Sequence, residues 1–278
     1  MPKLSIITVN LNNKSGLYDT ANSIITQTWT DYEWIIIDGG STDGSVDIIK
    51  EYSEITDKLT FWCSEPDNGI YHGMNKGIYK ASGEYCLFLN SGDWIISSET
   101  LKNVFFEING RISDIFYSDM MDSNNVIYKL PINLTIDFLI KSPINHQNSL
   151  IKRSLFIEHS FYNENLKLVS DWEFWLKEYW KYKSIFSHID TKISVYNFNG
   201  ISSVKSRYYN ESLIIISNVF NELSNIIFEY IEYQKFKEDI YYNIIKFHGN
   251  TKILIILLRI YRKIINIYKK VINFKYDK

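Results

Sequence analysis

Short apolar runs alternate with helical patterns over the first 120 residues, and this alternation constrains the fold more than any other feature of the chain. Strands are expected at residues 4–9, 34–37, 59–63, 85–89 and 115–117, and helices at residues 17–27, 45–52, 71–80 and 99–108. Strands that are separated by helices pair in parallel through right-handed crossovers. The sequence therefore predicts an α/β fold with a mostly parallel sheet that is flanked by helices.

The rhythm changes after about residue 125. Short strands are expected at residues 126–130, 147–151 and 193–196, and one clear helix at residues 171–182. We interpret this region as a smaller mixed extension of the same sheet, which would complete a substrate site. Beyond Lys205 the pattern is helical throughout. The prediction is a domain over residues 1–204 and a helical extension over residues 205–278.

Charge and cysteine content narrow the classes of function. The formal net charge of the 278 residues is -2, so no global basic field indicates a nucleic-acid partner. Cys63 and Cys86 both fall in apolar strand-like runs, which predicts buried free thiols in a reducing compartment rather than a disulfide framework. The apolar run at the N-terminus is too short for a signal peptide or a spanning helix, so a cytoplasmic protein is expected.

The last segment of the chain has the pattern of a basic amphipathic helix. Between Thr251 and Tyr276 lysine, arginine and asparagine recur every three to four residues among Ile, Leu, Val and Tyr, with no acidic residue. Such a helix suits the surface of an anionic bilayer, so we expect peripheral association with the inner face of the cytoplasmic membrane. The alternative is a helix that packs on the catalytic domain or on a dimer partner.

Three aspartates stand where a predicted strand ends or a helix begins. Asp38 follows the strand at residues 34–37 in the run DGGSTDGS, and Asp93 follows the strand at residues 85–89 in the run NSGD. Ligands of an open α/β sheet bind at the carboxyl ends of the strands, so both carboxylates are expected at one crevice. Thr8 and Asn10 end the first strand there and could contact a nucleobase. Asp171 opens the helix at residues 171–182.

The chain carries neither G-x-G-x-x-G after its first strand nor a Walker A motif. A bound nucleotide would need its phosphates neutralised in another way, and a divalent metal held by a carboxylate is the obvious one. Asp93 suits Mn²⁺ or Mg²⁺, with Asn90 as a weak neutral helper. The alternative explanation of this motif is a turn cap.

Two further segments could face an anion or an acceptor. In EPDNGIYHGMNKG polar residues precede and enter a helix, so backbone N–H groups and Lys76 could face phosphate. His146 stands at a loop-to-strand junction and could contact the diphosphate or the acceptor, although a lone histidine is more often structural.

Asp171 could take the proton of an attacking hydroxyl, and Glu173 is the alternative base. An N-cap aspartate is the structural explanation of Asp171.

Taken in order, six segments resemble the family 2 glycosyltransferases with the GT-A fold, particularly those of bacterial surface-polysaccharide synthesis. The segments are SIITVNLN, IIIDGGSTDGS, EPDNGIYHGMNKGI, FLNSGD, HQNSLIKRSLF and SDWEFWLK, and the resemblance covers roughly residues 3–200. The resemblance implies a Rossmann-like GT-A domain followed by the C-terminal helical extension.

The resemblance also implies roles for single residues. Asp38 matches the aspartate that contacts the uracil or ribose side of the donor, with Thr8 and Asn10 nearby. Asp93 matches the metal-binding end of the D-x-D motif, and Asp171 matches the general base. The residues that match a stretch lining the donor pocket are Asp67, Asn75 and Lys76. Asn90 and Gly92 depart from the pattern, because many relatives have Asp at these places.

The implied activity is inverting transfer of a hexosyl or N-acetylhexosaminyl group from a nucleotide sugar, expected to be a UDP-sugar. The expected acceptor is a saccharide or a polyprenyl-linked saccharide in lipopolysaccharide or capsule assembly. Two alternatives stay open. A nucleotidyltransferase would carry a glycine-rich and basic phosphate loop, which residues 8–16 lack. A catalytically inactive binding or assembly module would fit the departures at Asn90 and Gly92.

Overall fold

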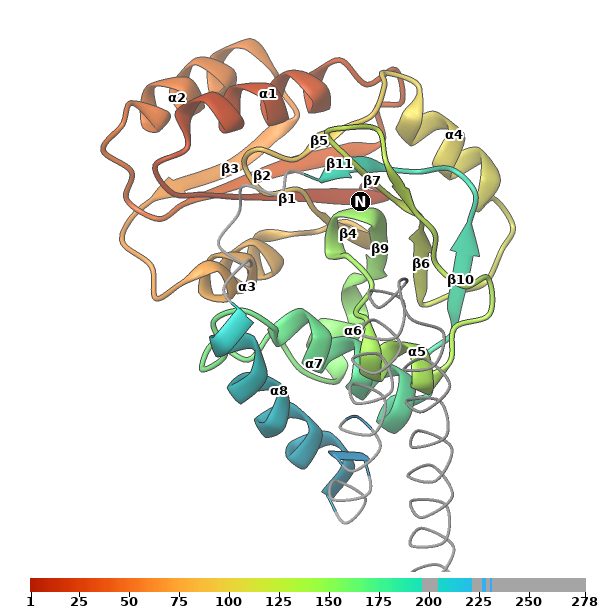
Figure 1. Cartoon of the computed structure of the whole chain (residues 1–278). Helices are drawn as coiled ribbons and strands as arrows, with labels where there is room; N and C mark the ends of the chain where they lie inside the picture. Colours follow the sequence, from red (N-terminus) through yellow and green to blue (C-terminus); the bar gives the residue numbers. More distant parts are fainter. Residues whose placement is uncertain (197–204, 222–226, 229–230, 232–278) are drawn as a thin grey trace, which may run out of the picture. The chain divides into compact units, whose positions relative to one another are not determined.

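The computed structural model describes residues 1–196, 205–221, 227–228 and 231 (Figure 1). Contacts within the chain group Met1–Val219 into one compact unit and Phe220–Lys278 into another. The first unit holds all the elements described below, apart from the last residue of helix α8 (Lys205–Phe220). The predicted division at residue 204 stays a prediction, and the predicted basic helix at residues 251–276 lies outside the described residues.

Seven strands form the main sheet in the order β10-β6-β9-β4-β1-β2-β3. β1 pairs in parallel with β2 and β4, β2 with β3, and β6 with β10, as the alternation of strands and helices predicts. β9 runs antiparallel between β4 and β6. The bounds are β1 (Leu4–Asn10), β2 (Tyr32–Asp38), β3 (Leu59–Ser64), β4 (Tyr85–Phe88), β6 (Ile115–Ser118), β9 (Ser149–Lys152) and β10 (Phe186–Ile189).

The predicted mixed extension is found only in part. Of the three strands predicted after residue 125, one joins the main sheet and makes it mixed, and β10, which was not predicted, forms an edge of this sheet. The strand predicted at residues 147–151 is β9, and its Leu150 and Ile151 are fully buried because β9 lies inside the sheet, between β4 and β6. The other two predicted strands are β8 (Ile127–Tyr128) and β11 (Ser194–Tyr196). They form a separate four-stranded sheet with β5 (Trp94–Ile95) and β7 (Met120–Asp122), in the order β5-β11-β7-β8.

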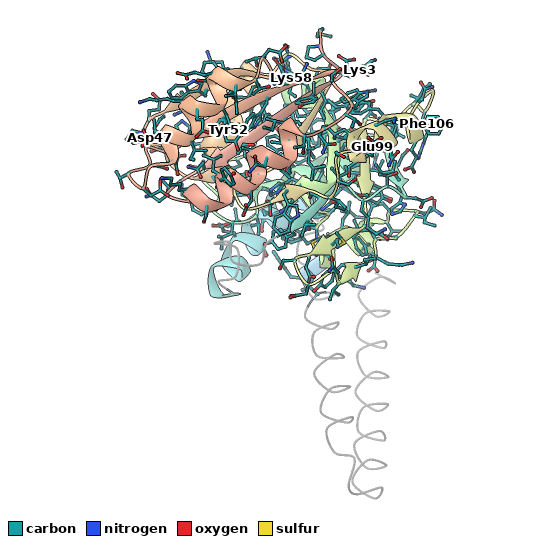
Figure 2. All side chains as sticks on the ribbon, turned by 90° about the horizontal axis from the view of Figure 1, so that it is seen from above. Lys3, Asp47, Tyr52, Lys58, Glu99 and Phe106 are labelled. Carbon is teal, nitrogen blue, oxygen red and sulfur yellow. The ribbon has the colours of Figure 1, made fainter. Side chains whose placement is uncertain are left out.

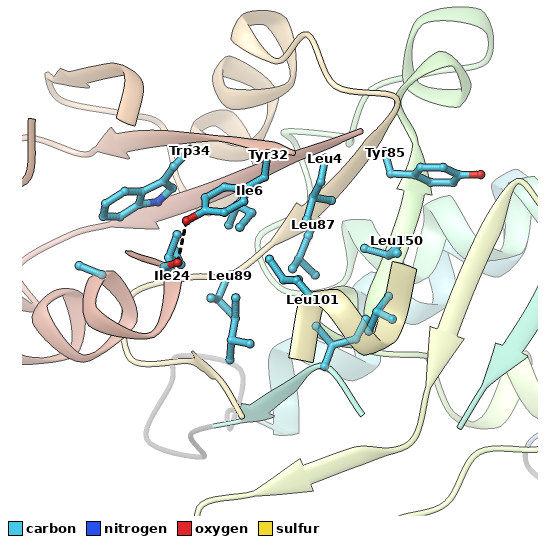
Figure 3. Packing of buried hydrophobic residues seen from close by; sticks show 14 of the residues in the cluster. Leu4, Ile6, Ile24, Tyr32, Trp34, Tyr85, Leu87, Leu89, Leu101 and Leu150 are labelled. Carbon is cyan, nitrogen blue, oxygen red and sulfur yellow. Dashed lines mark hydrogen bonds between the residues drawn. The ribbon is translucent and has the colours of Figure 1, made fainter. Parts of the chain in front are cut away.

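Helices cover both faces of β1, β2 and β3 (Figure 1). α1 (Lys14–Ile25) and α2 (Ser45–Ile55) lie on one face and α3 (Ile70–Lys80) lies on the other. Buried residues of α1, α2 and α4 (Thr100–Glu107) form one cluster with the strands, which includes Leu4, Ile6 and Leu101 (Figure 3). In this cluster the hydroxyl of Tyr32 donates to the carbonyl of Ile24 at 2.8 Å, so the phenol is buried without losing its hydrogen bond (Figure 3).

Two glycines let α3 approach β1 closely. A Cβ atom at Gly73 would lie 2.8 Å from Cγ1 of Val9, and a Cβ atom at Gly77 would collide with Cγ2 of Ile7. Protein interiors leave no room for such an added methyl group. The two glycines therefore let α3 pack directly against β1.

The remaining helices follow β8 and β9. They are α5 (Ile136–Lys141), the 3₁₀ helix η1 (His146–Asn148), α6 (Arg153–Glu158), α7 (Ser170–Leu176) and the π-helix η2 (Lys177–Tyr182). The helix predicted at residues 171–182 therefore continues from α7 into a π-helix. Phe156 of α6 stacks on Phe174 of α7 with ring centroids 4.6 Å apart, and Tyr162 packs edge-on against both rings. This aromatic cluster fixes the start of α7 relative to the main sheet.

Two neighbouring side chains of α4 differ strongly in their exposure to solvent. Phe105 stacks on Trp29 with centroids 3.8 Å apart, whereas its neighbour Phe106 is 84% exposed (Figure 2).

Both cysteines are free thiols, and Cys86 is buried as predicted. Cys63 is only half-buried, because β3 is the edge strand of the main sheet. Of the helices in the described part of the chain, none is long and apolar enough to cross a membrane.

Candidate active site

The carboxyl ends of β1, β2 and β4 bring four of the predicted site residues to one end of the main sheet. β1 lies between β2 and β4, so the chain leaves β1 toward one side and returns to β4 on the other side. This change of direction is the place where open α/β sheets bind ligands. Asn10 ends β1, Asp38 ends β2, and the loop with Asn90 and Asp93 follows β4.

Asp38 is fully buried and accepts hydrogen bonds at both carboxylate oxygens. Oδ1 accepts from Nδ2 of Asn10 at 2.7 Å and from the Ser41 hydroxyl at 2.6 Å. Oδ2 accepts from the Ser64 hydroxyl at 2.6 Å and from the amides of Gly40 and Ser41. Burial would raise the pKa of this carboxyl, but the hydrogen bonds outweigh burial and hold its pKa below the ordinary value. Asp38 thus fixes the loop that follows β2.

Thr8 and Asn10 are also held by protein partners. The hydroxyl of Thr8 is fully buried and accepts from Nε1 of Trp34 at 3.0 Å, so it belongs to the core. Asn10 is 1% exposed and donates to Asp38, while its Oδ1 has no hydrogen-bond partner among the described residues. Buried polar atoms without a partner are uncommon in folded proteins. Of the two residues, Asn10 is the one with an acceptor left for a ligand.

Asp67 approaches the end of β2 from the segment before α3. Its Oδ1 accepts from the amide of Gly69 at 2.9 Å. A Cβ atom at Gly39 would lie 2.8 Å from Oδ2 of Asp67, so the carboxylate occupies the space that a side chain at residue 39 would need. No described residue donates to Oδ2, and Asp67 is partly exposed.

Asn75 and Lys76 have partners of their own. Asn75 is 4% exposed, donates to the carbonyl of Tyr162 at 2.9 Å and accepts from its amide at 3.0 Å. Lys76 forms an ion pair with Glu65 at 2.7 Å. Asn75 therefore joins α3 to the loop before α7, and the structure does not bring these two residues to Asp93. Their role in donor binding stays a prediction.

The loop that carries Asp93 is tied to helix α1. Gly92 has φ of +103°, a conformation that favours glycine, and its amide donates to the Thr20 hydroxyl at 3.0 Å. The same hydroxyl lies 2.7 Å from the carbonyl oxygen of Asp93. Oδ2 of Asp93 accepts from Nε2 of Gln147 at 3.4 Å, and Asp93 is 6% exposed. Gly92, which departs from the D-x-D pattern, is thus required by the backbone of this loop.

Asp171 lies in the first turn of α7 and receives hydrogen bonds from two other segments and from its own helix. The Tyr71 hydroxyl donates to Oδ1 at 2.9 Å, as does the amide of Trp172. Nδ1 of His146 lies 3.0 Å from Oδ2, and Nε2 of His146 lies 3.2 Å from Nδ2 of Asn90. The structure thus links Asp171 through His146 to the loop that carries Asp93.

The alternative base has a different environment. Glu173 is 2% exposed, and its Oε2 lies 3.2 Å from Nζ of Lys177 one turn along the chain. A carboxylate that is buried and paired with a lysine has no open side for an acceptor hydroxyl. The geometry therefore favours Asp171 over Glu173 as the base.

A divalent metal would find one carboxylate at this site. Within the part of the chain that the structure describes, no group of three or more His, Cys, Asp or Glu side chains could hold a metal ion. Mn²⁺ and Mg²⁺ bind oxygen ligands and commonly take one or two protein carboxylates together with substrate phosphates. The donor set of Asp93 fits such an ion, provided that a diphosphate supplies further oxygens.

Sequence reasoning missed Tyr71, Gln147 and Thr20. Tyr71 and Gln147 belong to segments that the resemblance singled out, EPDNGIYHGMNKGI and HQNSLIKRSLF, but nothing in their spacing pairs them with Asp171 or Asp93. Thr20 lies within α1 and carries no signal in the sequence, because its role depends on the packing of α1 under the loop.

Residues 5–161, more than half of the chain, match the model of the family described as glycosyl transferase family 2. The chain belongs to this family. A PGL/p-HBAD biosynthesis glycosyltransferase of Mycobacterium bovis is 31% identical over 205 residues, which cover 73% of this chain and 80% of that protein. The putative teichuronic acid biosynthesis glycosyltransferase TuaG of Bacillus subtilis is 30% identical over 148 residues, which cover 51% of this chain and 59% of TuaG.

Solved structures show the same fold. S. aureus TarS 1–349 in complex with UDP-GlcNAc matches with a TM-score of 0.64 and 21% identity, covering 81% of this chain and 70% of that one. The mannosyltransferase PcManGT from Pyrobaculum calidifontis, in complex with GDP-Man and Mn²⁺, matches with a TM-score of 0.61 and 12% identity, covering 81% and 68%. The predicted GT-A fold and the predicted family are confirmed, and the chain is a glycosyltransferase.

Proposed function

We propose that the chain is an inverting glycosyltransferase that transfers a hexosyl or N-acetylhexosaminyl group from a UDP-sugar to a hydroxyl of a saccharide or lipid-linked saccharide. The observation that carries the proposal is the position of Asp171, whose carboxylate receives hydrogen bonds from Tyr71 and His146 next to the loop of Asp93. In this proposal Asp171 accepts the proton of the acceptor, and Asp93 lies beside the departing diphosphate.

The reaction needs one proton transfer and one displacement. Oδ2 of Asp171 takes the proton of the acceptor hydroxyl as its oxygen attacks the anomeric carbon. The bond between that carbon and the diphosphate oxygen breaks on the opposite side, so the configuration inverts and the nucleoside diphosphate leaves. Tyr71, the Trp172 amide and His146 orient the carboxylate during this step.

The departing diphosphate needs compensation for its charge. Asp93 would hold a Mn²⁺ or Mg²⁺ ion, which when bound supplies positive charge to the phosphate oxygens. The short loop around Gly92 and its bond to Thr20 fix the position of the Asp93 backbone before any ligand arrives. A preorganised carboxylate spends no free energy on reorganisation during the reaction.

The nucleoside would bind at the ends of β1 and β2. Asp38 would support this site without contacting the ligand, because its oxygens already accept five hydrogen bonds from the protein. Oδ2 of Asp67 and Oδ1 of Asn10 are the acceptors there without a described protein donor, and they suit ribose hydroxyls or a base N–H group. The solved relatives bind UDP-GlcNAc and GDP-Man, so both nucleotides belong in a test of the donor.

The acceptor is proposed from relatives and from the end of the chain. Two relatives are named for PGL/p-HBAD biosynthesis and for teichuronic acid biosynthesis, which supports a role in a surface polysaccharide such as lipopolysaccharide or capsule. The basic pattern at residues 251–276 supports contact with the cytoplasmic face of the membrane, where a polyprenyl-linked acceptor would lie. Full membrane association of a chain that lacks residues 250–278 would contradict this part of the proposal.

A panel of UDP- and GDP-sugars with Mn²⁺ tests the proposal, with released nucleoside diphosphate as the readout. The wild type should turn over one donor class, and the variants Asp93→Ala and Asp171→Asn should lose the turnover while they stay folded. Binding of UDP without turnover of any donor would instead favour the inactive binding module that Asn90 and Gly92 keep open. Membership of the glycosyltransferase family argues against the nucleotidyltransferase alternative.

A further inference from the structure

Three consecutive side chains of the 3₁₀ helix η1 hold three different parts of the site. His146 contacts Asp171, and Gln147 donates to Asp93. Oδ1 of Asn148 accepts from the amides of Ile193 and Ser194, at 3.3 and 2.9 Å. One short turn thus touches the proposed base, the proposed metal carboxylate and the second sheet.

We propose that this turn, His146–Asn148, is the positioning element that holds Asp171 in place relative to Asp93, and that His146 acts on Asp171 through its Nδ1–H group. His146 is then a positioning residue rather than a contact of the donor or acceptor. The proposal rests on the proposed function, because it gives the turn a task only if Asp171 is the base.

The neighbours of His146 fix its tautomer. A carboxylate only accepts hydrogen bonds, so the ring nitrogen that faces Oδ2 of Asp171 must carry the proton, and this nitrogen is Nδ1. Nε2 of the neutral ring is then an acceptor, and the group that faces it is the Nδ2 amide donor of Asn90. The hydrogen bonds therefore run in one direction, from Asn90 through His146 to Asp171. Asn90 is the first donor in this chain of hydrogen bonds.

The turn itself is held rigidly. Gln147 and Asn148 are 3% and 1% exposed, and the ring of His146 packs edge-on against Phe88 at the end of β4. The Ser149 hydroxyl donates to the carbonyl of Asn145 at 2.8 Å across the turn. A side chain that is confined on both sides can set the direction of its partner.

The second sheet closes a ring of contacts around Asp93. Ser194 of β11 donates its hydroxyl to the carbonyl of Gln147 at 2.8 Å. Ser194 pairs with Ile95 of β5, which follows Asp93 directly in the chain. The path from Asp93 through β5, β11 and Gln147 returns to Asp93, so the loop and the turn cannot move independently.

Three substitutions of His146 separate the hydrogen bond of Nδ1 from the packing of the imidazole ring. The amide of asparagine reaches the position of Nδ1, and the amide of glutamine reaches the position of Nε2. We expect the kcat of His146→Leu and His146→Gln to fall about tenfold to hundredfold, the loss expected for one hydrogen bond to a charged group, and His146→Asn to retain most of the activity. The matched control is His159→Asn, outside the site, with wild-type kcat. UDP binding with Mn²⁺ should be equal in all variants.

The tautomer has a direct readout that needs no substrate. In ¹⁵N-histidine-labelled protein, with the His146 signals assigned from the His146→Asn variant, the proton should reside on Nδ1 and not on Nε2. A proton on Nε2 would overturn the proposal, as would equal rates for the asparagine and glutamine variants. An Asp171→Asn variant with wild-type turnover would contradict the proposed function, whereas an inactive Asp171→Asn beside a fully active His146→Leu would contradict the positioning role alone.

Discussion

Nδ1 of His146 lies 3.0 Å from Oδ2 of Asp171, although 25 residues separate the two in the chain. On the other side of the carboxylate, the Tyr71 hydroxyl donates to Oδ1 from α3. The proposed base is thus assembled from three segments that meet only in the folded protein. Its geometry depends on the packing of α3, η1 and α7 against one another, and each of these contacts can be removed by a small substitution.

Tyr71→Phe should lower kcat by about tenfold, because it removes one hydrogen bond to a charged group. Burial, and then the neighbouring Asp171, raises the pKa of Tyr71 well above its ordinary value, so the hydroxyl remains a donor at every working pH. The measurement is steady-state release of nucleoside diphosphate at several pH values. The matched control is Tyr79→Phe in the same helix, whose side chain is 67% exposed. Equal rates for both variants would refute a role for the Tyr71 hydroxyl.

Asp38→Asn should lower the free energy of unfolding by about 1–3 kcal/mol at pH 7, since the buried donors around it lose part of their acceptor. The pKa of Asp38 is lowered in the folded state, so its contribution is present above the unfolded pKa of about 4 and is lost as pH falls through the folded pKa. The difference between wild type and variant should therefore shrink below about pH 4.

Urea unfolding at pH 7, 5 and 3.5 measures this dependence for Asp38→Asn. Asp57→Asn, at an exposed position, is the control and should change the free energy of unfolding by less than about 0.5 kcal/mol. A difference for Asp38→Asn that stays constant from pH 7 to pH 3.5 would show that its charge does not contribute.

Asp93→Ala should abolish the effect of Mn²⁺ on UDP binding. If one carboxylate and the diphosphate hold the ion together, Mn²⁺ tightens UDP binding to the wild type, and the variant binds UDP equally with and without the metal. Calorimetric titrations with UDP, each with Mn²⁺ and with EDTA, give the four affinities. An unchanged response to Mn²⁺ in the variant would place the metal ligand elsewhere.

Gly77→Ala should destabilise the fold by about 1–3 kcal/mol, because the added methyl group meets Ile7 of β1 in a close-packed core. Thermal unfolding measures the loss. The control is Glu54→Ala on the exposed side of α2, which should stay within about 0.5 kcal/mol of the wild type. A fully stable Gly77→Ala protein would mean that α3 can move away from β1 without loss.

The sequence predicts the first four strands and their helices because each is a local pattern with its own turn signals. β1, β2 and α3 lie within a few residues of the predicted ranges. The place of β9 could not be predicted in this way. Its buried residues, such as Leu150, resemble any apolar run, and only pairing with the distant strands β4 and β6 puts β9 inside the sheet.

In the candidate site, too, local patterns identify some residues, and others are recognised only in the folded chain. Asp93 and Asp171 could be identified from their places at a strand end and a helix start. Their partners could not, because the contact of Tyr71 with Asp171 spans 100 residues. Asp38 illustrates a different limit. Its turn is visible in DGGSTDGS, but Ser64 of β3 supplies another donor, and this saturation of the carboxylate appears only in the folded chain.

Turnover of Asp171→Asn shows directly whether this carboxylate is the general base. The assay compares wild type and variant with the nucleotide sugar that the panel selects, and UDP binding is measured on the same samples. We expect kcat to fall by about a hundredfold to ten-thousandfold, the range expected for a general base, while the affinity for UDP with Mn²⁺ stays unchanged. A folded Asp171→Asn protein that keeps the wild-type kcat would contradict the role of Asp171 as the general base.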